Sequence, residues 1–385
     1  MTIAILTSGI LPVPAVQGGA VENLIDFYLE YNEQHRLHDI TVYSVWHPDV
    51  VKHPAQKSEV NHYVYIKMEG WWNKVKKYFF QKTVSNPYYH YSIEYFLHEA
   101  IKDIRKKHFD AIILENRPAY SLKLKAVTDA KIIYHLHNDH LNKSVAQANA
   151  LYNNADQIIT VSDYIKECVQ TINSQDTKTT TVLNGIDLAT FATQTDNHEK
   201  QHDGFMMVFS GRLIPEKGIL QLIQAMQQLK AYPDIKLVII GSGSLGSNQD
   251  LTPFQQQLQD AVQGLNNIRF TGYIAYTEMA RYLQEADVAV LPSVWEEPFG
   301  LTVAEAQAAG LPIITTNQGG IPEVVTPQNA ILLDTGEHFV DHLAAAILDL
   351  YEHPEKRRQM AAVSLERAKL FDKETYAKNF FNTLK

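Results

Sequence analysis

Short apolar runs alternate with longer amphipathic stretches along nearly the whole chain. The runs predict a first series of β-strands at residues 2–7, 39–45, 111–115, 131–137 and 157–161, and a second series at 206–210, 236–240, 268–271, 288–291, 313–316 and 330–333. Strands that alternate with helices in this way are typical of parallel βαβ units. We therefore predict an α/β fold with two doubly wound parallel sheets.

A polar stretch from residue 184 to residue 204 separates the two series and offers almost nothing to a hydrophobic core. Such a segment between two sets of strands is typical of an interdomain linker. We place the linker at 189–204, a first domain at 1–188 and a second domain at 205–371. Ligands of doubly wound domains bind at the carboxyl ends of the strands, so we expect a cleft that the two domains share.

The end of the chain predicts three consecutive helices with no strand between them, at 337–351, 354–370 and 373–384. Helices in this arrangement cover a sheet rather than extend it. We expect residues 373–385 to return to the first domain and to pack there.

Composition excludes some classes of protein. The 385 residues exceed what one core usually holds, and their net charge of −9 argues against a nucleic-acid-binding protein. No run approaches the ~18 apolar residues that a membrane-spanning helix needs, and residues 1–7 lack the basic lead of an export signal. The single cysteine, Cys168, allows no internal disulfide, so we expect a buried thiol in a cytoplasmic protein.

The segment 296–306 predicts a loop that runs into a helix, and Gly310 marks the end of that helix. Free backbone N–H groups and the helix dipole make such an N-terminus favourable for a phosphate. The residues expected to lie against the phosphate are Pro298, Phe299, Gly300 and Leu301.

Two glutamates flank this N-terminus. Glu297 precedes the helix, and Glu305 lies about a turn and a half inside it. A carboxylate repels a phosphate, so we expect Glu297 to accept hydrogen bonds from sugar hydroxyls and Glu305 to accept one from a ribose hydroxyl. The alternative is that Glu297 caps the helix and Glu305 is solvated.

A second strand that runs into a helix start, at residues 210–218, carries the cations Arg212 and Lys217. Together they can bind a diphosphate in place of a divalent metal ion. The chain contains no Asp-x-Asp pair of the kind that holds a metal–diphosphate complex, so we expect neither a metal nor another cofactor. The alternative is that both cationic side chains are solvated.

Glycines mark two further connections between a strand and a helix. Gly18 and Gly19 precede Glu22 and can bring the backbone close to a ligand, although a plain flexible turn is the alternative. Gly241 and Gly243 fit the dinucleotide fingerprint, but the next strand ends without the acidic residue that the fingerprint requires. We therefore expect these two glycines near a donor nucleotide rather than near NAD.

His135 and His137 lie on the same side of a predicted strand, because side chains alternate along a strand. A metal pair is conceivable, but no third ligand has a convincing spacing. His137, at the carboxyl end of the strand, is the better candidate for contact with a sugar, and Asn138 follows it. His135 is expected inside the protein.

Residues 71–82 mix aromatic and basic side chains within an acidic protein. This mixture is typical of a segment that contacts a membrane surface, although inward-packed rings with solvated lysines are the alternative. The residues expected at the inner surface of the membrane are Trp71, Trp72, Lys74, Lys76 and Lys77.

Together these segments resemble glycosyltransferase family four, whose members retain the anomeric configuration and have the GT-B fold of two Rossmann-like domains. The matching motifs span both halves of the chain: Gly18–Glu22, His135–Asp139, Asn184–Asp187, Gly211–Gly218, Gly241–Gly243, Glu297–Ala306 with its Glu-x7-Glu spacing, and Gly319–Glu323. The resemblance implies a nucleotide-diphosphate sugar as the donor substrate and no metal.

The resemblance also implies roles for individual residues. The expected catalytic residues are Arg212, Lys217, Glu297 and His137. The expected donor-binding residues are Gly19, Gly211, Gly241, Gly243, Tyr273, Pro298, Phe299, Gly300, Leu301 and Glu305. The expected acceptor-side residues are Gly18, Glu22 and Asn138.

The opening residues 6–23 resemble, more narrowly, bacterial enzymes of capsule and cell-wall polysaccharide assembly, the streptococcal capsule rhamnosyltransferases among them. This resemblance implies hexose transfer to a lipid-linked saccharide acceptor. It favours a dTDP-rhamnose donor, with a UDP-hexose as the alternative. It also implies a cytoplasmic protein that is peripheral at the inner face of the cell membrane, which agrees with the basic aromatic segment.

Two other classes remain open. One is a nucleotide-sugar 2-epimerase of the same architecture, which acts on a UDP-sugar without any acceptor. The other is a non-catalytic binding protein that keeps the cleft but serves assembly.

Overall fold

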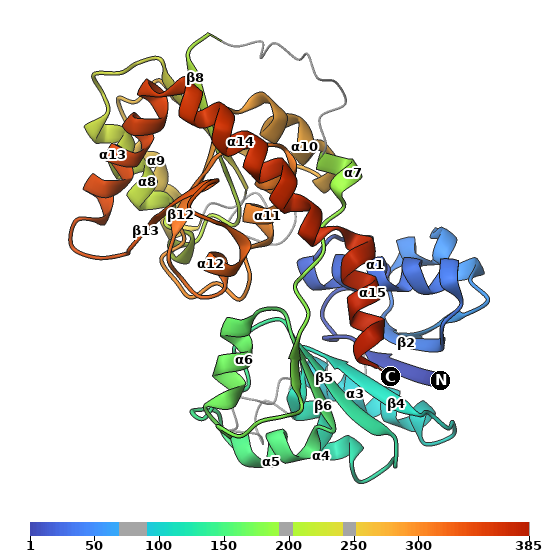
Figure 1. Ribbon diagram of the computed structural model, residues 1–385. Helices are drawn as coiled ribbons and strands as arrows, with labels where there is room; N and C mark the ends of the chain where they lie inside the picture. Colours follow the sequence, from blue (N-terminus) through green and yellow to red (C-terminus); the bar gives the residue numbers. More distant parts are fainter. Residues whose placement is uncertain (69–90, 192–202, 242–251, 385) are drawn as a thin grey trace. The chain divides into compact units, whose positions relative to one another are not determined.

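The chain divides into two compact units (Figure 1). Unit 1 comprises Met1–Gly185 and Lys373–Lys385, and unit 2 comprises Ile186–Asp372. The computed structural model describes residues 1–68, 91–191, 203–241 and 252–384. Residues 71–82, Gly243 and most of the expected linker therefore lie outside the described part of the chain.

Unit 1 is built on a parallel sheet of seven strands in the order β3-β2-β1-β4-β5-β6-β7. The strands are β1 (Thr2–Leu6), β2 (Asp39–Val45), β3 (Asn61–Ile66), β4 (Ala111–Glu115), β5 (Lys131–Leu136), β6 (Gln157–Thr160) and β7 (Thr179–Thr181). The central strands are almost entirely buried, as expected for a parallel sheet that is covered on both faces.

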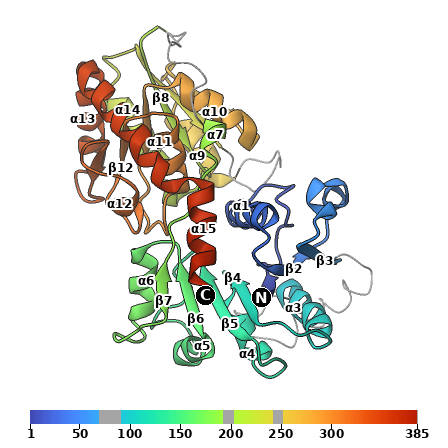
Figure 2. The ribbon, with the colours of Figure 1, turned by 45° about the vertical axis from the view of Figure 1, so that its right-hand side comes forward.

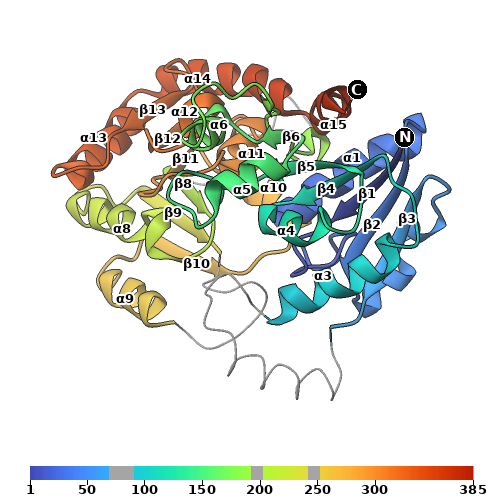
Figure 3. The ribbon, with the colours of Figure 1, turned by 90° about the horizontal axis from the view of Figure 1, so that it is seen from below.

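The helices of unit 1 cover both faces of this sheet. Figure 3 shows α3 on the opposite face from α1. The helices are α1 (Ala20–His35), α3 (Tyr91–Ile104), α4 (Ser121–Leu124), α5 (Ala148–Asn154), α6 (Asp163–Gln170) and α15 (Lys373–Thr383).

The last helix, α15, packs against α1 and so brings the end of the chain into unit 1. The ring of Phe380 stacks on Tyr28 of α1 with a centroid distance of 4.4 Å, and Phe380 is fully buried. At the end of α15, the Thr383 carbonyl accepts a hydrogen bond of 2.9 Å from Gln157. Figure 2 shows that the two chain termini lie near one another in this unit.

Unit 2 is built on a parallel sheet of six strands in the order β10-β9-β8-β11-β12-β13. The strands are β8 (Phe205–Ser210), β9 (Ile235–Ile240), β10 (Ile268–Gly272), β11 (Val288–Leu291), β12 (Ile313–Thr316) and β13 (Ala330–Leu333). The helices are α7 (Leu188–Phe191), α8 (Ile219–Gln228), α9 (Pro253–Ala261), α10 (Tyr276–Glu285), α11 (Leu301–Ala308), α12 (Ile321–Val324), α13 (Phe339–Glu352) and α14 (Pro354–Ala368).

The predicted α/β fold class is confirmed, and every strand predicted from the apolar runs is present with ends that differ by at most one residue. Two strands of unit 1, β3 and β7, were not predicted from the sequence. Both are edge strands, and only some of their residues are buried. A strand at an edge need not be uniformly apolar, so the pattern that revealed the central strands is weak there.

Two expectations from composition concern the described residues. Among these residues, no helix is long and apolar enough to cross a membrane. The expectation of a buried Cys168 was wrong, because its side chain is partly exposed on α6. This helix turns Ile165 and Val169 toward the core instead.

Candidate functional site

In the sheet of unit 2, β9 and β10 lie on one side of β8, and the later strands β11, β12 and β13 lie on its other side. The strand order therefore reverses between β8 and β11. In doubly wound sheets, ligands bind beyond the carboxyl ends of the two strands at this switch point. Lys217 lies in the connection that follows β8, and Glu297 lies in the connection that follows β11. The topology therefore brings these two residues together at the carboxyl ends of β8 and β11.

The structure joins them in an ion pair. The ammonium group of Lys217 contacts the carboxylate of Glu297, and Ser293 Oγ donates a hydrogen bond of 2.7 Å to Glu297 Oε1. The side chains of Lys217 and Glu297 are only 20% and 10% exposed. The alternative in which Lys217 is a solvated helix-start charge is therefore contradicted.

Main-chain contacts fix the two connections against each other. The carbonyl of Glu216 accepts hydrogen bonds from Val294 N at 2.9 Å and from Ser293 Oγ at 3.0 Å. Gly218 has a φ of 68°, and a Cβ atom there would lie 1.8 Å from the carbonyl oxygen of Pro292. Any side chain at this position would push the two connections apart.

The helix that follows Glu297 has a free N-terminus. Gly300 is the N-cap residue of α11, and no side chain caps this helix end. The alternative in which Glu297 caps the helix is therefore contradicted. Its carboxylate instead binds Lys217, and its main-chain oxygen accepts a hydrogen bond of 2.7 Å from Gly320 N. The uncapped N–H groups that begin at Leu301 remain suited to an anion.

Two neighbours of this N-terminus, Pro298 and Phe299, were also expected to bind the donor. Phe299 is 2% exposed, and its ring packs edge-on against Phe371 with a centroid distance of 5.6 Å. Its side chain therefore anchors the loop in the core, and only its main chain is placed to meet a ligand. Pro298 is partly exposed.

Glu305 lies inside α11 and is 7% exposed, so the alternative of a solvated Glu305 is contradicted. Burial raises the pKa of Glu305 to about 8, against a smaller lowering by a hydrogen bond from the side chain of Tyr276. The ring of Tyr276, at the start of α10, packs edge-on against Phe191 at 5.4 Å.

The remaining donor-side residues follow neighbouring strands of the same sheet. Gly211 N donates to the carbonyl of Ile240 at 3.0 Å, and Gly241 N donates to the carbonyl of Gly272 at 3.0 Å. The side chain of Arg212 is exposed and forms no hydrogen bond or ion pair with another described residue, whereas its carbonyl accepts a hydrogen bond of 3.0 Å from Ile214 N. Tyr273, which follows β10, is 56% exposed. The structure thus places these residues at strand carboxyl ends. Among their side chains in the described part of the chain, those of Lys217 and Glu297 form an ion pair.

The sheet of unit 1 has its own switch point between β1 and β4. Gly18 lies in the connection after β1, and Gly19 is the N-cap residue of α1. Gly19 has a φ of 113°, and a Cβ atom there would lie 2.2 Å from Glu22 Oε2. This positive φ is a conformation that glycine adopts readily and that other residues rarely adopt. Glu22 is buried, and this burial raises the pKa of its carboxyl group.

On the neighbouring strand β5 and directly after it, His135 and His137 both contact Glu115, the last residue of β4. His135 Nδ1 lies 3.0 Å from Glu115 Oε2, and His137 Nε2 lies 2.9 Å from the same oxygen. The predicted placement of both histidines on one side of β5 is thereby confirmed. Asn138, which follows β5, accepts a hydrogen bond of 3.3 Å from His140 N in a local turn.

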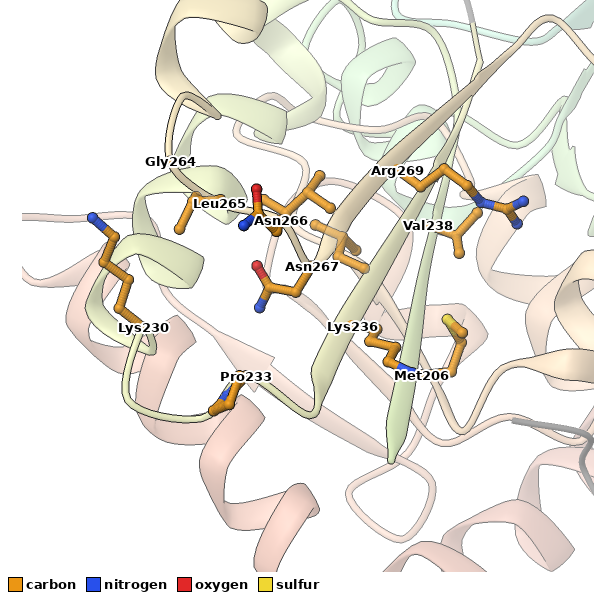
Figure 4. Close-up of a pocket in the computed structure, with 12 residues that line it drawn as sticks. Met206, Lys230, Pro233, Lys236, Val238, Gly264, Leu265, Asn266, Asn267 and Arg269 are labelled. Atoms are coloured by element: carbon orange, nitrogen blue, oxygen red, sulfur yellow. The ribbon is translucent and has the colours of Figure 1, made fainter. Parts of the chain in front are cut away.

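A pocket with a volume of about 420 Å³ lies at the edge of the unit 2 sheet, beside β9 and β10 (Figure 4). None of the site residues predicted from the sequence is among the described residues that line it. Its basic side chains do not converge, because Lys230 and Arg269 point away from one another in Figure 4. The pocket therefore does not compete with the strand ends as the candidate site.

Comparisons with known proteins agree with this architecture. Residues 31–190 match the family model described as Glycosyltransferase Family 4, and residues 191–366 match the model described as Glycosyl transferases group 1. The chain is a glycosyltransferase of the GT-B fold. The enzyme class and the fold predicted from the motifs are both confirmed.

The similarity of the glycosyltransferase to its relatives covers all or nearly all of the chain. Spore coat protein SA of Bacillus subtilis is 29% identical over 96% of this chain and 94% of its own length. The putative glycosyltransferase YtcC of the same organism is 29% identical over 100% of this chain and 91% of its own length. The crystal structure of Anabaena HepE in complex with UDP-glucose has a TM-score of 0.75 at 20% identity and covers 100% of this chain and 99% of that one.

Glu115 of the glycosyltransferase was not among the site residues predicted from the sequence. One ligand atom of Glu115 and one of each histidine lie within 4.8 Å of one another, so a third possible metal ligand accompanies the histidines, although none has a convincing spacing in the sequence. Glu115 was overlooked because it belongs to another strand, where it pairs in register with His135. A carboxylate that ends the buried run Ala111–Glu115 was the available signal, because an unpaired charge is costly inside a core.

The raised pKa of Glu305 predicts a dependence of stability on pH. A carboxyl group whose folded pKa of about 8 exceeds its usual value of 4.5 stabilises the fold fully below pH 4.5, and this contribution is lost as the pH rises through 8. In the ligand-free glycosyltransferase, the melting temperature should therefore fall more between about pH 5 and about pH 9 than it does in Glu305→Gln. Thermal unfolding of both proteins across this range tests the expectation. Parallel curves would show that Glu305 does not titrate there.

Proposed function

We propose that the glycosyltransferase transfers a hexose, with retention of configuration and without a metal ion, from a nucleotide-diphosphate donor to a lipid-linked saccharide in surface polysaccharide synthesis. The observation that carries the proposal is the partly buried ion pair of Lys217 and Glu297 beside the uncapped N-terminus of α11. A cation and a helix N-terminus bind phosphate, whereas a carboxylate binds hydroxyls.

The ion pair gives each partner a separate role once a donor is bound. Lys217 binds the diphosphate together with Arg212 and the N–H groups at the start of α11. Glu297 is then released to accept hydrogen bonds from hydroxyls of the donor sugar. In the ligand-free chain, the two groups neutralise each other, which keeps both of these weakly exposed charges satisfied.

The chemistry requires no nucleophilic side chain. The bond between the anomeric carbon and the phosphate oxygen breaks while the acceptor oxygen bonds to the same face of the sugar. The acceptor proton passes to the departing phosphate oxygen. Lys217, Arg212 and the helix N-terminus stabilise the charge that develops on the diphosphate, and His137 lines the region of the anomeric carbon.

The donor base and sugar are proposed on the resemblance of residues 6–23. That resemblance favours dTDP-rhamnose, while the UDP-glucose complex of HepE favours a UDP-hexose. Glu305 is compatible with both, because a deoxyribose still offers it one hydroxyl and a ribose offers two. The lipid-linked acceptor and the membrane contact of residues 71–82 are likewise proposed on the sequence.

A screen of donors against acceptors tests the proposal. dTDP-rhamnose, UDP-glucose and UDP-galactose are each incubated with the glycosyltransferase, with and without membrane lipids that carry saccharide acceptors, and the products are separated by mass. We expect a glycolipid from dTDP-rhamnose only when the lipids are present. Interconversion of a UDP-sugar without any acceptor would instead identify a 2-epimerase. Donor binding without any product would indicate a binding protein.

Removal of Arg212 should affect turnover more than it affects the fold. Because its side chain is exposed, Arg212→Ala should unfold at the same temperature as the unchanged chain. Loss of one charge-stabilising donor should lower kcat by roughly 10²- to 10³-fold. Arg281→Ala is the matched control, because Arg281 is 74% exposed and pairs only loosely with Glu285 at 3.7 Å. Near-normal turnover in Arg212→Ala would remove this residue from the mechanism.

Metal chelation should leave transfer unimpaired. The proposal assigns charge neutralisation of the diphosphate to Arg212, Lys217 and the helix N-terminus, and the chain contains no Asp-x-Asp pair. The measurement is the initial rate in excess EDTA, compared with the rate after Mg²⁺ or Mn²⁺ is added back. A rate that vanishes with EDTA and returns with metal would contradict this assignment.

A further inference from the structure

Glu115 is a fully buried carboxylate that receives hydrogen bonds from three side chains of unit 1. The hydroxyl of Tyr28 donates a hydrogen bond of 2.9 Å to Glu115 Oε1. His135 Nδ1 lies 3.2 Å from Oε1 and 3.0 Å from Oε2, and His137 Nε2 lies 2.9 Å from Oε2. Glu115 and His135 are 0% exposed, and His137 is 9% exposed.

The chemistry of a carboxylate decides where the protons on these rings lie. An ionised carboxylate only accepts hydrogen bonds, so each ring nitrogen that faces it must carry a proton. Although burial alone would raise the pKa of Glu115, the charge of His135 and hydrogen bonds from both histidines lower it to about 2. Glu115 is therefore ionised at neutral pH, and His137 Nε2 is the nitrogen that carries a proton.

The second nitrogen of His137 is then left with a lone pair. Burial lowers the pKa of His137 to about 4, so the ring is neutral at neutral pH. His137 Nδ1 is buried and has no hydrogen-bond partner among the described residues. A buried polar atom without a partner in the ligand-free protein is suited to a partner that the substrate supplies.

We propose that Glu115 is a positioning residue that holds His137 in the Nε2–H tautomer, so that Nδ1 accepts a hydrogen bond from a hydroxyl of the transferred sugar. The inference rests on the proposed function, in which His137 contacts that sugar. Beyond that function, Glu115 acts through His137, and His137 Nδ1 is the acceptor of the hydrogen bond from the sugar hydroxyl.

The surroundings of Glu115 hold this arrangement in place. Asn116 Oδ1 accepts a hydrogen bond of 3.1 Å from His137 N, which fixes the main chain at the end of β5. Phe380 of α15 stacks on Tyr28 and lies 5.1 Å from the ring of His135. The return of α15 to unit 1 therefore closes the wall behind the carboxylate and its donors.

A metal ion bound by Glu115 and the two histidines is the competing interpretation. Histidine ligands of a metal almost always donate their second ring nitrogen to a partner. The second nitrogens here, His135 Nε2 and His137 Nδ1, have no partner among the described residues. Hydrogen bonds to the carboxylate account for the short contacts without a metal, so we favour the tautomer.

The first part of the test is a direct reading of the tautomer in the ligand-free chain. Long-range ¹H–¹⁵N correlation of protein with ¹⁵N-labelled histidine distinguishes the protonated ring nitrogen from the bare one. The signals of His137 are assigned by their disappearance in His137→Gln. We expect a proton on Nε2. A proton on Nδ1, or stoichiometric zinc in the purified chain by elemental analysis, would overturn the inference.

The second part is the isosteric change Glu115→Gln. The amide oxygen should face the donors Tyr28 and His135, which leaves the amide N–H groups facing His137 Nε2. The ring should then carry its proton on Nδ1 and lose the acceptor that the sugar requires. We expect the reversed tautomer in the NMR spectrum and a kcat/KM that falls about 10- to 100-fold. A reversed tautomer with unchanged kcat/KM would overturn the proposed role.

The matched control is Tyr134→Phe on β5, the strand that also carries His135. The hydroxyl of Tyr134 makes hydrogen bonds of 2.7 Å to Ser121 Oγ and to the carbonyl of Leu151, away from the histidines. This variant loses buried hydrogen bonds as Glu115→Gln does, but it should keep the Nε2–H tautomer and its kcat/KM. An equal loss of kcat/KM in both variants would assign a structural role to Glu115. Because the tautomer is read without substrate, its outcome does not depend on the proposed transfer reaction.

Discussion

The ion pair of Lys217 and Glu297 is the interaction on which the donor half of this glycosyltransferase depends. Two opposite charges with little exposure are stable there only because each satisfies the other and Ser293 adds a hydrogen bond. The pair lies where the strand order of unit 2 reverses, so the fold itself brings it together. A donor that offers phosphate to the lysine and hydroxyls to the glutamate replaces this internal contact with two external ones.

Unit 1 applies the same physical rule to a different group. Glu115 is a charge inside a core, and Tyr28, His135 and His137 surround it with donors. In both units, a buried carboxylate thus lies beside the switch point of the sheet, at the end of a strand for Glu115 and in the connection after a strand for Glu297. The difference is in what the carboxylate does: Glu297 is placed to exchange its partner for a substrate, whereas Glu115 keeps its partners and orients one of them.

The fold and part of the site could be predicted from the sequence, and the reasons are physical. Central parallel strands are apolar on both faces, so their runs stand out, whereas the edge strands Asn61–Ile66 and Thr179–Thr181 do not. Lys217 and Glu297 follow strands that meet at the switch point, so motif and topology both indicate them. A charge at the end of the buried run Ala111–Glu115 is visible in the sequence, but its pairing with His135 depends on the register between two strands, which local patterns do not contain. The burial of Phe299 likewise depends on Phe371, far along the chain.

The most direct measurement of the central claim is a crystal structure of the glycosyltransferase with a bound nucleoside diphosphate, UDP or dTDP. The account predicts that the diphosphate lies against the N–H groups of Gly300 and Leu301, within hydrogen-bond distance of Lys217, and that the contact of Lys217 with Glu297 is broken or shared. A diphosphate bound elsewhere in unit 2, with that ion pair left as it is in the ligand-free chain, would contradict the account.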